Sequence, residues 1–142
     1  KLIASLIMIT NDYQVRVHYG WIDPMGFLYH AHYVDLFDMG RTELMRSLGV
    51  PYAKIEEMGI MMPVIDLAIQ YKNPAHYDDL ITIRTILKEE PRVRCTFYYE
   101  VYRPTGELIT TAHVTLAFMH LATHKPTRCP KFLLDLVHDK LL

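Results

Sequence analysis

The sequence is poor in cysteine and has no excess of either charge. Its 142 residues include two cysteines, Cys95 and Cys129, and no CxxC pair, which predicts buried thiols in a reducing compartment. Fifteen Lys and Arg residues oppose sixteen Asp and Glu residues. A chain without a basic field is not expected to bind nucleic acid or an anionic membrane. We therefore expect a cytoplasmic protein whose partner is a small molecule.

Long apolar runs and the common catalytic signatures are also missing. The opening run KLIASLIMIT is far shorter than the ~20 residues that cross a bilayer, and no small-x-small cleavage site follows it. We interpret residues 1–12 as a packed terminal segment. The chain has no GxSxG, no Gly-rich phosphate loop and no HExxH, which disfavours a serine hydrolase, a P-loop enzyme and a zincin.

The apolar pattern predicts a single α+β domain over residues 1–142. Residues 13–19 alternate between apolar and polar side chains, which is typical of a half-buried strand. Apolar residues recur at three and four positions over residues 30–48, which predicts a long helix, and a terminal helix is expected from Pro130. Short, turn-rich links separate four further strand patterns, at residues 62–71, 80–87, 93–103 and 107–119. This order predicts a curved antiparallel sheet that covers one central helix.

Gly40 lies on the apolar stripe of the predicted helix, together with Tyr33, Phe37 and Leu44. Glycine inside a helix costs ~1 kcal/mol relative to alanine. A close approach of the helix backbone to the sheet would offset this cost. We therefore expect Gly40 to mark the contact between the helix and the sheet.

Asp23 is a lone carboxylate in the apolar loop GWIDPMGFLYHAHY, which covers residues 20–33. It stands between Pro24 and Gly26, so one interpretation is a plain turn residue. The other is a carboxylate that faces a cleft, because it follows a strand and precedes a helix whose first amides point to the same place. Tyr19 and His30 could converge on this loop. Tyr19 could equally be a core aromatic, and His30 a histidine bonded to backbone.

Two further groups of side chains could bind ligands. The pair His30 and His32 suggests zinc, but residues two apart do not share a helix face and no third ligand has suitable spacing, so no metal site is expected. Several cations could form a patch for a phosphorylated ligand, although each alone is typical of a solvated surface: Lys72, Arg92, Lys125 and Arg128, with Arg84 and Arg94 as further candidates.

The loop and three later motifs resemble a known family. The run Y-x-x-x-D-x-x-G-x-x-Y-H-x-x-Y covers residues 19–33 and is followed by DMGRTELMRSLG, YKNPAHYDDLI and HKPTRCP. Together they resemble the hotdog-fold acyl-CoA thioesterases of the 4-hydroxybenzoyl-CoA thioesterase and YbgC-like group, over about residues 13–137. The resemblance implies a five-stranded antiparallel sheet wrapped around the long helix. It also implies a homodimer or homotetramer with active sites between subunits.

The same resemblance implies roles for individual residues. Asp23 would act as general base or as nucleophile, and a backbone N–H near His30 would bind the oxyanion. Tyr19 and His30 would orient Asp23 or the water. CoA would be held by surface cations as part of the substrate, with no separate cofactor. The aromatic content suits an aromatic or an aliphatic acyl group equally well.

Two rival functions stay open beside hydrolysis. A hotdog protein can be a non-catalytic binder of acyl-CoA or fatty acyl groups. A hydratase or dehydratase on the same fold would need a differently placed pair of histidine and acid, which this sequence does not show.

Overall fold

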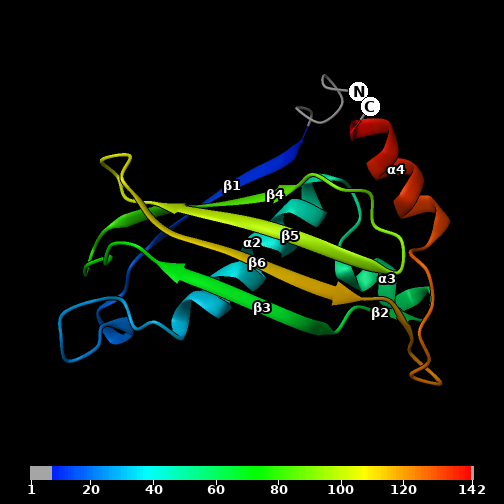
Figure 1. Ribbon diagram of the computed structural model, residues 1–142, viewed down its shortest axis with the longest axis horizontal. Coiled ribbons are helices and arrows are strands. Elements are labelled where there is room, and N and C mark those ends of the chain that lie inside the picture. Colours follow the sequence, from blue (N-terminus) through cyan, green and yellow to red (C-terminus); the bar gives the residue numbers. More distant parts are fainter. Residues whose placement is uncertain (1–7, 142) are drawn as a thin grey trace.

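A five-stranded antiparallel sheet forms the frame of the computed structural model, which describes residues 8–141 (Figure 1). The strand order is β1–β4–β5–β6–β3. The bounds of the strands are Ile9–Arg16 for β1, Val64–Tyr71 for β3, Leu80–Leu87 for β4, Arg94–Tyr102 for β5 and Leu108–Ala117 for β6. The predicted α+β class and the predicted sheet are confirmed. Residues 1–7 of the predicted terminal segment lie outside the described residues.

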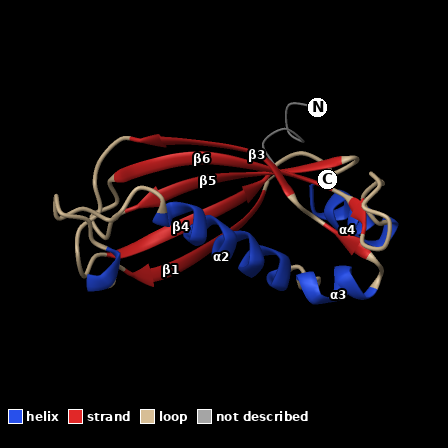
Figure 2. Cartoon of the chain, turned by 90° about the horizontal axis from the view of Figure 1, so that it is seen from below, coloured by secondary structure: helices blue, strands red, loops and turns tan. Residues whose placement is uncertain are grey.

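The long helix α2 (His32–Ser47) runs along one face of this sheet (Figure 2). Its predicted apolar stripe is buried, with Phe37 and Leu44 fully covered. A Cβ built on Gly40 would lie 2.5 Å from Thr85 Oγ1 of β4, which is too close for any real side chain. Gly40 therefore does lie where the helix meets the sheet. The helix ends at Ser47, and Gly49 follows its C-cap residue Leu48 with a φ of 82°, which favours glycine.

Smaller elements cover the end of the sheet where β3 begins. Helix α3 (Tyr52–Glu57) leads into β2 (Ile60–Met61), which pairs with β7 (Met119–His120) in a two-stranded ribbon that the sequence did not predict. The terminal helix α4 (Lys131–Leu141) follows Pro130 as expected, and buries Leu133, Val137 and Leu141. No helix within residues 8–141 is long and apolar enough to cross a membrane.

The predicted strand over residues 13–19 is wrong in its bounds. Strand β1 pairs along the whole of β4, from Ile9 opposite Leu87 to Arg16 opposite Leu80. The chain then leaves the sheet, because the backbone of Val17 bonds to the loop at Asp78 and Asp79. Residues Tyr19–Trp21 form a 3₁₀ turn, η1. Tyr19 therefore does not continue the strand face that holds Val15.

Strand β3 forms an edge of the sheet that α2 does not cover. Leu67 pairs with Val114 and points to the helix side, yet it is 39% exposed. Val64, Ile65 and Tyr71 are exposed to a similar extent. Among residues 8–141, β3 is thus an apolar strand with an unpaired edge and an uncovered face.

Candidate active site

The Asp23 loop is a tight turn built around its own carboxylate. Asp23 N–H donates to the carbonyl of Phe27 at 2.8 Å, and Gly26 N–H donates to the carbonyl of Asp23 at 2.9 Å. Asp23 Oδ1 accepts from the N–H groups of Met25 at 2.9 Å and Phe27 at 3.1 Å. Within the described chain Oδ2 has no partner. One oxygen therefore holds the turn while the other is free for chemistry, so the two interpretations of Asp23 are compatible.

A second loop supports the first. Leu28 N–H donates to the carbonyl of Ala75 at 2.9 Å, and Phe27 forms a β-bridge with His76. This supporting loop, residues 72–79, connects β3 to β4 and is stabilised by hydrogen bonds to Asp79. The Asp79 carboxylate accepts from His76 N–H at 3.0 Å and from Arg103 Nε at 3.1 Å. The position of Asp23 thus depends on the end of β3.

The start of α2 supplies backbone donors beside the loop. The helix begins at His32, and its N-cap residue Ala31 has no side chain that could cap it. Neither His30 N–H nor Ala31 N–H has an acceptor among residues 8–141. Free amides at a helix N-terminus attract negative charge through the helix dipole. The carbonyl of His30, in contrast, accepts a bond of 2.7 Å from the hydroxyl of Tyr71.

One cavity of about 270 Å³ lies between the Asp23 loop, the start of α2 and the end of β3. Three predicted site residues line it: Asp23, His30 and Lys72. The other lining residues were not singled out from the sequence: Met25, Phe27, Leu28, Tyr33, Tyr71, Asn73 and Pro74. Tyr71 is the last residue of an alternating strand, but the pattern alone does not reveal that it reaches the helix start. The cavity therefore combines a carboxylate with apolar walls, beside the start of α2.

Tyr19 lies apart from this cavity. It is 78% exposed, and its ring meets that of Tyr77 edge to face at 5.6 Å. Its predicted catalytic role stays a prediction that this geometry does not favour. His32 packs on Trp21 at 4.3 Å between ring centroids. Over residues 8–141 no three His, Cys, Asp or Glu side chains gather as metal ligands would.

The predicted cations divide between the two ends of the sheet. Lys72 lines the Asp23 cavity. Arg92 and Arg128 lie together at the far end, because Cys129 N–H donates to the carbonyl of Arg92 at 2.6 Å. Lys125 belongs to the nearby loop after β7, shown in orange in Figure 1, opposite the blue Asp23 loop. Of these four predicted cations in the described part of the chain, only Lys72 lines the cavity that holds Asp23.

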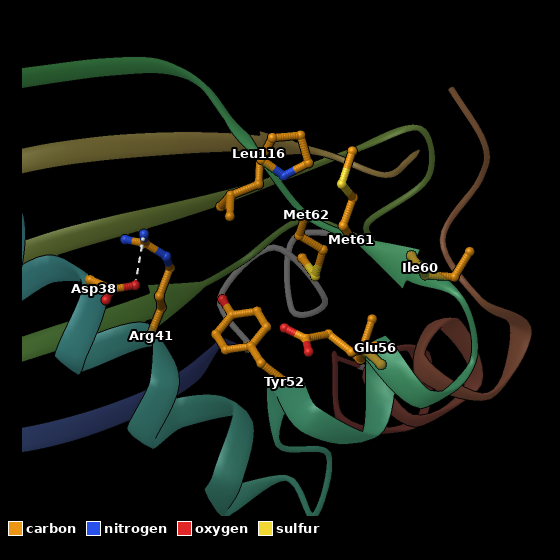
Figure 3. Close-up of a pocket in the computed structure, with 10 residues that line it drawn as sticks. Asp38, Arg41, Tyr52, Glu56, Ile60, Met61, Met62 and Leu116 are labelled. Carbon is orange, nitrogen blue, oxygen red and sulfur yellow. Dashed lines mark ion pairs between the residues drawn. The ribbon is translucent and has the colours of Figure 1, made fainter. Parts of the chain in front are cut away.

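A second cavity, of about 330 Å³, opens beside the beginning of β3 (Figure 3). Helix α2 contributes Asp38 and Arg41, which form an ion pair at 3.0 Å, and α3 contributes Tyr52 and Glu56. Arg41 is buried, and so is the Tyr52 hydroxyl, which has no hydrogen-bond partner among the described residues. Met61, Met62, Pro63 and Leu116 form the apolar side. The two cavities thus adjoin opposite ends of one edge strand.

Comparison with known proteins identifies the family. Residues 17–137 match the model of the thioesterase-like superfamily. The chain belongs to that superfamily. This thioesterase is 35% identical to YneP of Bacillus subtilis over 110 residues, which cover 75% of this chain and 80% of that protein. It is 33% identical to the acyl-CoA thioesterase YbgC of Haemophilus influenzae over 127 residues, which cover 87% and 93% of the two chains.

A solved structure confirms the fold. The DHNA-CoA thioesterase from Staphylococcus aureus superposes with a TM-score of 0.84 at 30% identity, covering 92% of this chain and 87% of that chain. The predicted family and the hotdog arrangement of this thioesterase are therefore confirmed.

Proposed function

We propose that this thioesterase hydrolyses an acyl-CoA to a free carboxylic acid and CoA. The observation that carries the proposal is a carboxylate oxygen without a partner in the described residues, Asp23 Oδ2, on a cavity that His30 also lines. The unused N–H groups of His30 and Ala31 lie at the adjoining start of α2. Thioester hydrolysis needs both: a base or nucleophile, and donors for the oxyanion that forms at the acyl carbonyl. The name of the YbgC relative supports CoA as the thiol.

The reaction starts when the acyl carbonyl oxygen of the substrate accepts hydrogen bonds from the N–H groups of His30 and Ala31. In the general-base route Asp23 removes a proton from water, the hydroxide oxygen bonds to the acyl carbon, and the C–S bond breaks with the electron pair leaving on the CoA thiolate. The proton held by Asp23 then neutralises the thiolate. In the nucleophilic route Asp23 Oδ2 attacks the acyl carbon and displaces the CoA thiolate, and water hydrolyses the resulting anhydride.

His30 has a supporting role in this scheme. Its side chain is exposed and lines the cavity, with its ring 6.2 Å from that of Tyr71. We assign it to orienting the water that attacks. The scheme uses only side chains and backbone amides of this protein, so CoA enters as part of the substrate and no separate cofactor is proposed. Activity that persists in a metal chelator would agree with this.

We propose that the protein functions as a dimer formed across β3. A two-fold axis that pairs this strand with its copy makes the two strands antiparallel. The apolar side chains that one chain leaves exposed would then be covered, among them Ile65 and Leu67. The beginning of β3 in one chain would lie beside the end of β3 in the other. The second cavity of each chain would thereby come next to the Asp23 cavity of its partner and extend the space for the acyl group.

The same arrangement gives the distant cations a role. Arg92, Lys125 and Arg128 lie at the end of the sheet where β3 begins, so a dimer would bring them toward the Asp23 cavity of the other chain. There they would bind the phosphates of CoA. We also propose a cytoplasmic location, in line with the free state of Cys95 and Cys129.

An assay for free thiol tests the proposed function directly. The purified protein is incubated with a set of aromatic and aliphatic acyl-CoAs, and CoA release is followed with a thiol reagent. Release that saturates with substrate and depends on Asp23 is the expected result. Tight binding of acyl-CoA without any CoA release would instead support the rival function, a non-catalytic acyl-CoA binder.

A further inference from the structure

We propose that Tyr71 is a positioning residue of the active site, which orients the oxyanion-binding amides through the carbonyl of His30. The inference rests on the proposed function and adds a residue that acts on the reaction from the edge strand. Tyr71 Oη donates to the carbonyl oxygen of His30 at 2.7 Å, across 41 residues of sequence. This bond joins the end of β3 to the residues that precede α2.

The geometry of the peptide group makes this contact effective. The carbonyl of His30 and the N–H of Ala31 belong to one planar trans peptide unit, so fixing the direction of the oxygen fixes the direction of the N–H on the other side. The preceding N–H, that of His30, shares the His30 Cα with this unit. Tyr71 therefore restricts the Ala31 N–H directly. Through the shared Cα it also limits the His30 N–H, whose own peptide unit is held as well by the bond from His32 N–H to the Tyr29 carbonyl at 3.0 Å. A hydrogen bond to the carbonyl also polarises the peptide and strengthens its N–H as a donor.

Two backbone bonds also hold the helix start, from His32 N–H to the Tyr29 carbonyl at 3.0 Å and from Val34 N–H to the Ala31 carbonyl at 3.2 Å, but neither acts on the carbonyl of His30. The N-cap residue is Ala31, which offers no side-chain hydrogen bond, and α2 makes its first regular turn only from His32. Residues that precede a helix without a cap are free to fray. The Tyr71 hydroxyl takes the place of a cap, although it acts on a carbonyl and leaves the amides available for a ligand.

The Tyr71 side chain is itself held in place. Its ring packs edge to face on Tyr33 at 5.5 Å, and Tyr33 is buried in the first turn of α2. Partial burial raises the pKa of the Tyr71 hydroxyl above its ordinary value, so the group stays protonated and able to donate at neutral pH. The hydroxyl is therefore a permanent donor to His30 and is not a candidate base.

Substitution of Tyr71 by phenylalanine removes only this hydroxyl. Tyr29 offers a matched control, because it is also 48% exposed, adjoins His30, and has a hydroxyl with no acceptor in the described residues. Removing an oxyanion donor outright costs ~10²–10³ in kcat, so loosening two donors should cost less, about 5- to 30-fold. We expect Tyr71→Phe to lower kcat by that factor with KM within about two-fold. Tyr29→Phe should retain wild-type kinetics.

A spectroscopic measurement separates positioning from a merely structural role. In the Asp23→Asn background, an acyl-CoA labelled with ¹³C at the thioester carbonyl is bound without turnover, and its carbonyl stretch is recorded. Donors aimed at the oxygen lower this frequency. Adding Tyr71→Phe should move the frequency back toward that of free substrate, whereas adding Tyr29→Phe should not. Unfolding midpoints and light scattering of all variants should match those of their parents.

Three results would overturn the inference while leaving the proposed function intact. The first is a Tyr71→Phe enzyme with the kinetics of Tyr29→Phe. The second is a higher KM with unchanged kcat, which would make Tyr71 a direct substrate contact. The third is an unshifted carbonyl frequency in the double variant. If the wild-type protein releases no CoA from any acyl-CoA, the proposed function itself fails, which is a different outcome.

Discussion

Asp23 and Phe27 are joined by two reciprocal hydrogen bonds, from Asp23 N–H to the Phe27 carbonyl at 2.8 Å and from Phe27 N–H to Asp23 Oδ1 at 3.1 Å. The second bond needs only a side-chain oxygen that accepts. An asparagine can supply that oxygen, but it cannot act as a base. The turn and the chemistry can therefore be separated by substitution.

We predict that Asp23→Asn leaves the unfolding midpoint nearly unchanged and lowers kcat by at least ~10²-fold, with KM within a few fold. Asp23→Ala should lose activity to the same extent and also lose stability, because Met25 and Phe27 then lack their acceptor. Steady-state kinetics and thermal melts of the two variants test this. A fully active Asp23→Asn protein would remove Asp23 from the mechanism.

Gly40 offers a test of helix packing. Its Cβ would meet Thr85 Oγ1 at 2.5 Å and Ile83 Cγ2 at 3.1 Å. Gly40→Ala should lower the free energy of unfolding by ~1–3 kcal/mol despite the better helix propensity of alanine, and Gly40→Leu by more. Thr85→Ala should relieve part of the cost, whereas the isosteric Thr85→Val should not. A double-mutant cycle in denaturant measures the coupling; additive effects would contradict the contact.

Substitution of the cations that lie far from Asp23 should affect the hydrolysis only of substrates that carry the CoA nucleotide. These cations are Arg92, Lys125 and Arg128. Arg128→Glu should raise KM for acyl-CoA more than it lowers kcat, because a phosphate contact binds the ground and transition states alike. N-acetylcysteamine thioesters, which lack the nucleotide, should be unaffected. Lys54→Glu, on exposed α3 at the same end of the protein, is the control. Equal effects on both substrates would show that Arg128 does not bind CoA.

The proposed dimer depends on the exposed face of β3. Leu67→Glu places a charge on that face and should give a monomer in light scattering, with reduced activity. Gln14→Glu, on the opposite edge strand β1, should leave the dimer intact. A wild-type protein that is monomeric and fully active at micromolar concentration would contradict the proposal.

His138 should make stability depend on pH. Its Nδ1 contacts the carboxylate of Glu90, and this hydrogen bond raises the pKa of His138 above its ordinary value. Because the pKa of His138 is raised in the folded state, its contact with Glu90 adds to folding stability when the histidine is protonated. This stabilisation is complete below the unfolded pKa of about 6.5 and is lost as pH rises through the folded pKa. The difference in melting temperature between the wild type and His138→Ala should therefore be largest near about pH 6 and vanish at alkaline pH. A difference independent of pH would assign the effect to packing.

The sequence predicted elements well where local pattern and tertiary structure agree. Strand β4 matches the predicted 80–87, because turn residues bound it on both sides, and α2 begins and ends within two residues of the expected range. Strand β1 was misplaced because alternation continues past Arg16, while the backbone of Val17 turns to bond with a loop about sixty residues away in the chain. No local pattern contains that information.

The sequence likewise predicted the residues of the candidate site that a local pattern brings together. Asp23 and His30 were predicted together because they belong to one loop between a strand and a helix, and both line the same cavity. Tyr71 was not, because its bond to His30 joins an edge strand to a helix start through the fold alone. The cations were grouped by type, but the sheet separates Lys72 from Arg128.

The free amides of His30 and Ala31 bear on how such an enzyme can diverge. Because these donors belong to the main chain, no ordinary side-chain replacement at either position deletes them, and only proline would remove an N–H. The carboxylate at position 23, by contrast, can be lost in a single step. Under the proposed mechanism, a single substitution at Asp23 would therefore abolish catalysis and leave ligand binding. Changes in the cavity walls, such as Met25 or Asn73, alter which acyl group fits and leave the oxyanion donors in place.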